Sequence, residues 1–168
     1  MRRIVISSLL SASFALPALA EDSTMVTLKA KQIGEIFCLS RLGNDTGPIE
    51  GLLTESLKSA IADADQKDAA WEKQNPGEKP PLGDGIPWQA WPDYAASCTV
   101  GLLTLSRTDA KVEIKYGFPE DPKADFVDTL LLKKIDQADY GIGFWRIDNI
   151  AYATGSDLKA ELLVAFAE

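Results

Sequence analysis

Residues 75–93 contain five of the nine prolines of the chain, together with three glycines and two tryptophans. Neither an α-helix nor a central β-strand can continue through such a segment, because proline lacks a backbone N–H and has a fixed φ. We therefore expect a long loop that separates two parts of the chain. A loop of this length is typical of a functional or a disordered segment, and the two tryptophans favour one that packs on the rest of the domain.

The residues before the loop have the apolar spacing of helices. From Met25 to Leu42 apolar residues recur at roughly helical spacing, and Gly43 is placed to end a first helix. After a turn at residues 44–48, Thr54 is a candidate N-cap for a second helix. The stripe along one face of this second helix consists of Leu57, Ile61, Ala64, Asp68 and Trp71.

After the loop, the pattern changes from helical spacing to alternation. Val112, Ile114 and Tyr116 alternate with charged residues, as in a strand with one buried face. Similar runs, joined by short connections, make up four predicted strands at residues 96–106, 111–118, 125–135 and 143–152. A final helix is expected after Gly155, with Ser156 as its N-cap. Its apolar stripe consists of Leu158, Leu162, Leu163 and Phe166.

The N-terminus has the pattern of an export signal. Arg2 and Arg3 precede an apolar stretch at residues 4–16, and a small-x-small cleavage site ends at Ala20. Residues 1–20 are therefore predicted to be a cleaved signal peptide. Because Glu21 follows instead of cysteine, no lipid anchor is evident, and no other apolar segment reaches the ~20 residues of a membrane span. The sequence predicts a soluble protein of the bacterial periplasm.

The order of the elements predicts one α+β domain that spans residues 21–168. We expect the N-terminal helices to lie over one face of a curved four-stranded antiparallel sheet, with a C-terminal helix after it. Because the four strands are consecutive and joined by short links, each is predicted to pair with the next one along the chain, as in an antiparallel meander. In an oxidising compartment, Cys38 and Cys98 are expected to form a disulfide that ties the first helix to the first strand. No C-x-x-C motif indicates a redox function.

Composition excludes several classes of function. The formal net charge is −8, and it becomes −10 when the two arginines of the signal peptide are removed, so a nucleic acid is not expected as a partner. The sequence contains no histidine, which excludes Ser-His-Asp and Cys-His catalysis and every metal site that depends on imidazole. We expect no cofactor and no metal.

Three segments carry a resemblance to a known family. They are residues 71–85 (WEKQNPGEKPPLGDG), Leu52-Leu53-Thr54 before them, and residues 144–150 (FWRIDNI) after them. With these segments the chain resembles a family of exported bacterial proteins of uncharacterised activity, grouped with the nuclear-transport-factor-2-like, or cystatin-like, cone folds. The resemblance implies a curved sheet wrapped around helices, with a cone-shaped cavity between them. It implies no particular activity, because a fold is not a function.

A cone cavity can catalyse a reaction when a carboxylate and a hydrogen-bond donor face each other inside it. The candidate carboxylates are Asp68, Asp84 and Asp93, and the candidate phenols are Tyr94, Tyr116 and Tyr152. Asp68 is either a carboxylate at the edge of its helical stripe or a polar group aimed into a cavity. No pair is shown by the sequence to converge. Asp121, Asp125 and Asp128 fit no calcium loop and are expected on the solvated surface.

The turn at residues 82–85 is the other candidate site. Asp84 on this turn, with Trp88, Trp91 and Tyr94 nearby, could present a carboxylate and aromatic rings to a ligand. Alternatively, the glycines only permit the turn, Asp84 caps a short helix near Pro87, and the tryptophans cover the open end of the core.

The sequence therefore predicts a binding or protein-interaction domain without catalysis, whose partner is an envelope protein or a small molecule. Its candidate binding residues are Asp68, Asp84, Trp88, Trp91, Asp93 and Tyr94. One alternative is a cone-cavity enzyme of the isomerase or dehydratase class that uses an acidic general base. A second is an inhibitor or immunity protein against a basic envelope hydrolase, because a negative domain attracts basic partners. A homodimer is possible in either case.

Overall fold

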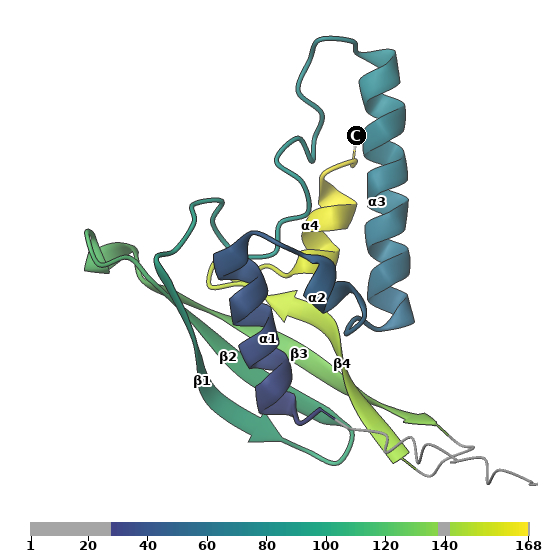
Figure 1. Cartoon of the computed structure of the whole chain (residues 1–168). Coiled ribbons are helices and arrows are strands. Elements are labelled where there is room, and N and C mark those ends of the chain that lie inside the picture. Colours follow the sequence, from purple (N-terminus) through teal and green to yellow (C-terminus); the bar gives the residue numbers. More distant parts are fainter. Residues whose placement is uncertain (1–27, 138–141, 168) are drawn as a thin grey trace, which may run out of the picture.

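The computed structural model describes residues 28–137 and 142–167, so the predicted signal peptide lies outside the described residues (Figure 1). The helices are α1 (Ala30–Gly43), α2 (Gly47–Glu50), α3 (Glu55–Gln74) and α4 (Leu158–Val164). The strands are β1 (Ser97–Leu105), β2 (Asp109–Gly117), β3 (Phe126–Gln137) and β4 (Ile142–Ala151), with a 3₁₀ turn at Pro122–Ala124. The predicted α+β class and the order of its elements are confirmed.

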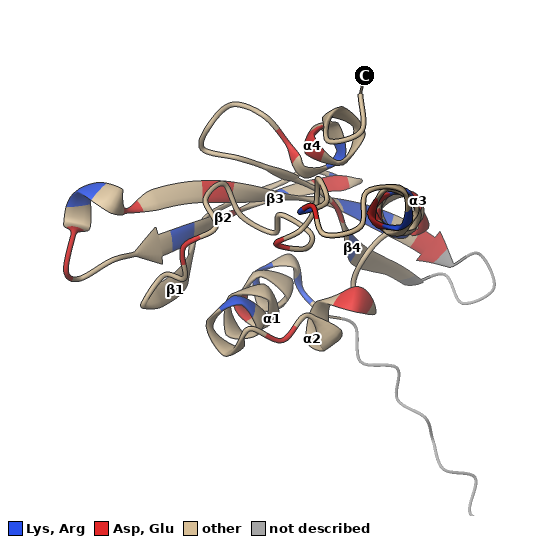
Figure 2. Ribbon diagram, turned by 90° about the horizontal axis from the view of Figure 1, so that it is seen from above, with Lys and Arg blue, Asp and Glu red and all other residues tan. Residues whose placement is uncertain are grey.

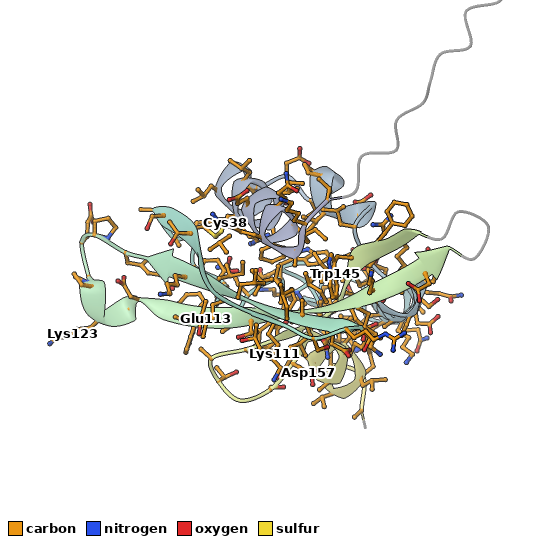
Figure 3. All side chains as sticks on the ribbon, turned by 90° about the horizontal axis from the view of Figure 1, so that it is seen from below. Cys38, Lys111, Glu113, Lys123, Trp145 and Asp157 are labelled. Carbon is orange, nitrogen blue, oxygen red and sulfur yellow. A yellow bond between two sulfur atoms is a disulfide. The ribbon has the colours of Figure 1, made fainter. Side chains whose placement is uncertain are left out.

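The four strands form one curved antiparallel sheet in the order β1-β2-β3-β4, as the meander prediction required. Alternation along β2 places Val112, Ile114 and Tyr116 in the core. Lys111 and Glu113 lie on the face away from α1, where Figure 3 labels both. Irregular pairing between Val100 and Leu103 in β1, and opposite Leu131 and Leu132 in β4, bends the sheet at two places.

Helix α1 packs near β1 and β2 on the face of the sheet that carries Val112 and Ile114, here called the inner face. Ile33 and Phe37 on its buried face are fully enclosed. A Cβ atom at Gly34 would lie 2.8 Å from Cγ1 of Val112, so glycine permits this close approach. Leu42 is exposed, contrary to the apolar pattern that included it, because the helix turns that position to solvent in its last turn.

Two helix ends differ by one residue from the prediction. The left-handed residue after α1 is Asn44, with φ 49°, and not Gly43, because asparagine also tolerates this conformation. At the start of α4, the side chain of Asp157 and not that of Ser156 accepts the N–H of Ala160, at 2.9 Å. Thr54, in contrast, caps α3 as predicted, with its hydroxyl oxygen 3.2 Å from the N–H of Leu57.

The other helices are attached near β4. Residues 52–54 run beside its outer edge, where the N–H of Thr54 bonds the carbonyl of Ile147 at 2.9 Å. Figure 2 shows α1 and α2 on one side of the sheet and α4 on the opposite side, so the helices do not share one face. Helix α4 buries Leu158 and Leu162, whereas Leu163 of its predicted stripe is exposed.

A disulfide joins α1 to the first strand. Cys38 and Cys98 are bonded with their Cα atoms 5.2 Å apart, and Cys38 is buried in the core. The predicted pairing is therefore confirmed. Among the described residues, no helix has the length and apolar character needed to cross a bilayer.

Replacing both Cys38 and Cys98 by alanine should lower the free energy of unfolding by about 4 kcal/mol, because the bridge closes a long loop in the unfolded chain. The two residues are 60 positions apart. Urea unfolding of the oxidised protein and the double variant measures the difference. The reduced parent protein is the control and should unfold like the variant; equal midpoints for the oxidised parent and the variant would contradict the prediction.

Candidate functional site

The loop between α3 and β1 returns from the far end of α3 to the sheet (Figure 1). Its turns use glycine where the backbone has positive φ, which is 90° at Gly77 and 82° at Gly85. No helix begins near Pro87, so the expected short helix capped by Asp84 is absent from this segment. The segment of residues 84–94, here called the tryptophan segment, lies over the inner face of the sheet.

Side chains from several elements fasten this loop. Asp68 on α3 accepts the N–H of Leu82 at 2.8 Å, so its carboxylate is used to hold the loop. The hydroxyl of Tyr152, which follows β4, donates to the carbonyl of Pro87. The middle of the loop is thus attached at two points, Leu82 and Pro87, to other elements of the domain.

Gln89 organises the centre of the tryptophan segment. Its side chain is only 7% exposed, and its amide nitrogen donates to the carbonyls of Trp91 (2.8 Å) and Asp93 (2.7 Å). Its amide oxygen accepts the Nε–H of Arg41, at the C-terminal end of α1, at 3.1 Å. This chain of hydrogen bonds connects the tryptophan segment to α1.

Asp128 is the buried anchor of the segment. Its two carboxylate oxygens accept the N–H groups of Ala90 and Ala153, each at 2.9 Å. The expectation that Asp128 belongs to the solvated surface is wrong, because the carboxylate is fully buried. Asp121 and Asp125 are exposed, as expected. Burial raises the pKa of Asp128 above its usual range, although the two backbone hydrogen bonds oppose this shift.

Two tyrosines lie close to this carboxylate. Burial, followed by the charge of Asp128, raises the pKa of both Tyr116 and Tyr152 above the usual range of a phenol. Within residues 28–137 and 142–167, the buried hydroxyl of Tyr116 has no hydrogen-bond partner. The convergent carboxylate and phenols are therefore Asp128, Tyr116 and Tyr152. Two of the predicted phenols belong to this group, but none of the predicted carboxylates does.

This group lies beneath the tryptophan segment and lines neither of the two large grooves. The alternation of Phe126, Asp128, Leu130 and Leu132 was the available signal that Asp128 faces the core. The sequence interpretation missed it because Asp128 was grouped with the acids next to it in the chain. Within this group, Asp128 and Tyr152 hold the loop in place through their hydrogen bonds to Ala90 and Pro87.

Two open grooves flank the tryptophan segment. The larger, of about 760 Å³, lies between this segment and α1, α2 and α3; the smaller, of about 600 Å³, lies between the segment and α4. The residues that line both grooves are Arg41, Asp84, Gly85, Ile86, Trp88 and Tyr94. Residues of the tryptophan segment therefore line both grooves and separate them from each other.

The aromatic residues predicted for the site take different positions. Trp88 is 7% exposed and belongs to the core, although it also lines both grooves. Trp91 is 43% exposed in the smaller groove, with its ring edge-on to Phe126 at a centroid distance of 4.8 Å. Tyr94 is 63% exposed, and its hydroxyl bonds the Asn44 side chain at 3.0 Å. Trp88 therefore covers the core, as one of the two alternatives predicted, whereas Trp91 is accessible in the smaller groove.

Of the three carboxylates predicted for the site, only Asp84 lines a groove. Asp84 lines both grooves and forms a 2.6 Å ion pair with Lys79. Asp93 is exposed and lines neither groove, and Asp68 lines neither as well. Asp65, an acid that the sequence interpretation did not select, lines the larger groove, where burial and then the nearby Asp68 charge raise its pKa.

Arg41 and Gln89 are the other site residues that sequence reasoning missed. Arg41 stands in the last turn of α1, where a basic residue is ordinary, and nothing local indicates a groove. In the part of the chain that the structure describes, no group of three or more histidine, cysteine, aspartate or glutamate side chains could hold a metal ion.

No family model, curated protein sequence or solved structure matches this chain. The class of protein is therefore defined by its fold and site alone: a disulfide-linked α+β domain with a fastened aromatic loop between two grooves.

Substituting Asp128 by asparagine should make the stability depend differently on pH. Because the folded pKa is raised, the contribution of Asp128 is fully present below the ordinary carboxyl range and is lost as pH rises through the folded pKa. The stability of the parent protein relative to Asp128→Asn should thus fall with rising pH in this window, by about 1.4 kcal/mol per pH unit at most. Urea unfolding at a series of pH values tests this, and a difference that increases with pH would contradict it.

The two buried tyrosines should respond differently to removal of their hydroxyl groups. Tyr152→Phe leaves the carbonyl of Pro87 without this partner and should lower the free energy of unfolding by about 1–2 kcal/mol. Tyr116→Phe removes a hydroxyl that has no partner among the described residues, so it should change stability by less than about 0.5 kcal/mol. Each variant is the control for the other in chemical denaturation. Equal losses of unfolding free energy in the two variants would contradict the hydrogen bond assigned to Tyr152 and its absence at Tyr116.

Proposed function

We propose that this chain is an exported binding domain without catalysis, which takes its ligand or partner in the grooves beside the tryptophan segment. The observation that carries the proposal is the contrast between two kinds of polar group. Asp128 and its tyrosines are closed beneath the segment, whereas Trp91, Tyr94 and Arg41 line open grooves. Binding sites commonly combine apolar and aromatic walls with a few fixed polar groups.

The rigidity of the segment supports a binding function. Asp128 accepts the N–H of Ala90, the hydroxyl of Tyr152 donates to the carbonyl of Pro87, and Arg41 donates to the side chain of Gln89. Just before the segment, Asp68 accepts the N–H of Leu82. A wall that is ordered before binding loses little conformational entropy when a ligand arrives. The exposed rings of Trp91 and Tyr94 offer apolar area with few rotatable bonds.

The compartment and the partner are part of the same proposal. The N-terminal signal pattern and the Cys38–Cys98 disulfide favour the bacterial periplasm. The partner is an envelope protein or a small molecule, and the formal charge of −10 that remains without the two arginines of the signal peptide favours basic proteins where the partner is a protein. Inhibition of a basic hydrolase and formation of a homodimer belong to this class of interaction.

One observation favours the alternative of a cone-cavity enzyme. Asp128, Tyr116 and Tyr152 provide a carboxylate and two phenols in one buried place, the combination that an acid–base reaction needs. A substrate could reach them only if residues 87–90 left the sheet and broke the bond between Ala90 and Asp128. Slow hydrogen exchange at the Ala90 N–H would therefore count against this enzyme, and fast exchange would favour it.

Replacing Trp91 by alanine should reduce binding and leave the fold intact, because nearly half of this side chain is exposed in the smaller groove. Replacing the buried Trp88 should instead lower the free energy of unfolding by about 3–5 kcal/mol. Native mass spectrometry of each protein, purified gently from its own host, measures the retained ligand or partner. Thermal unfolding measures stability.

Leu102→Ala is the matched control, since Leu102 is an exposed apolar residue on β1 and lines neither groove. The Leu102 variant should retain the same bound mass as the parent protein. The proposal fails if Trp91→Ala also retains that mass, or if the parent protein carries no ligand or partner under any condition of release.

A further inference from the structure

Arg41 has an unusual position among the charged side chains of the site. It is a basic residue that lines both grooves. Five ion pairs occur among residues 28–137 and 142–167, and Arg41 takes part in none of them. Lys58, the other cation of the larger groove, is paired with Glu55 at 2.9 Å. The positive charge of Arg41 is thus not neutralised by a direct contact in the described chain.

The partner that Arg41 does have is neutral. Its Nε–H donates to the amide oxygen of Gln89 at 3.1 Å, and Gln89 is held in turn by the carbonyls of Trp91 and Asp93. A buried amide therefore orients the guanidinium through one nitrogen without cancelling its charge. The two terminal nitrogens, which recognise carboxylates in a fork geometry, make no hydrogen bond to any described residue.

The smaller groove is the better place for an anion. The larger groove also contains Glu50 and Asp65, which repel negative charge. In the smaller groove the acids are Asp84, which Lys79 neutralises at 2.6 Å, and Glu161. The apolar residues of its wall include Pro81, Leu82, Ile86, Pro87, Trp91 and Val164.

We infer that the smaller groove binds an amphipathic carboxylate, with the carboxylate on the guanidinium of Arg41 and the apolar body along Trp91 and the prolines. Charge complementarity selects the headgroup, and the aromatic and proline-rich wall selects the apolar body. This inference rests on the proposed function, because it names the chemical class of ligand for one of the two grooves. Gln89 is a positioning residue that holds Arg41 in place.

Calorimetric titration of the full-length mature protein with octanoate, octanol and octyltrimethylammonium tests the inference. The three probes share one alkyl chain and differ in headgroup charge. Octanoate should bind at least about tenfold more tightly than octanol, as expected for a hydrogen bond to a charged group. Arg41→Gln should remove this preference and leave octanol binding unchanged.

Arg107→Gln is the matched control, since it removes the same charge from an exposed position between β1 and β2 and should leave octanoate binding unchanged. If Arg41→Gln fails to fold, Arg41→Lys keeps the charge but not the fork and should still weaken octanoate binding. Equal binding of octanoate and octanol, stronger binding of the cation, or unchanged octanoate binding in the Arg41 variants overturns the carboxylate site alone. If none of the three probes binds and the protein also retains no ligand or partner from its host, the binding function itself fails.

Discussion

The architecture of the site depends on one buried carboxylate. Asp128 has an oxygen for each of two backbone N–H groups, one from Ala90 in the tryptophan segment and one from Ala153 after β4. Both donors would be left without a partner if this side chain were apolar. The hydroxyl of Tyr152 adds a bond to Pro87 in the same region. Because this anchor holds the segment over the sheet, the walls of both grooves are placed by it.

The fastened segment also separates the polar chemistry of the domain into two zones. Beneath it, Asp128 and Tyr116 are buried and have pKa values raised by their burial. Above it, Arg41 and Trp91 line an open groove. A buried carboxylate near phenols is an arrangement that some active sites use. The two backbone hydrogen bonds that Asp128 accepts nevertheless give it a structural role that needs no catalysis. The open zone is the part of the molecule that a ligand can reach without unfolding the loop, and for this reason we propose a binding function.

Local sequence signals predicted most of the fold. Proline marked the loop, alternation marked the strands, and the Thr54 cap was identified because its partner, Leu57, is only three residues away. Errors arose where two neighbouring residues could serve the same purpose, as with Asn44 beside Gly43 and Asp157 beside Ser156. In such cases the packing of the whole helix selects the residue that caps it.

The sequence by itself determined the α+β order of elements, the meander, the pairing of the two cysteines and the position of the aromatic loop, because each depends on local patterns or on a single available partner. Only the tertiary structure decided that Asp128 is an anchor, that Trp88 is core while Trp91 is exposed, and that Arg41 stands in a groove. Arg41 and Gln89 are 48 positions apart, and Asp128 and Ala90 are 38 apart. Contacts over such separations are set by how the loop crosses the sheet, which no local pattern of residues encodes.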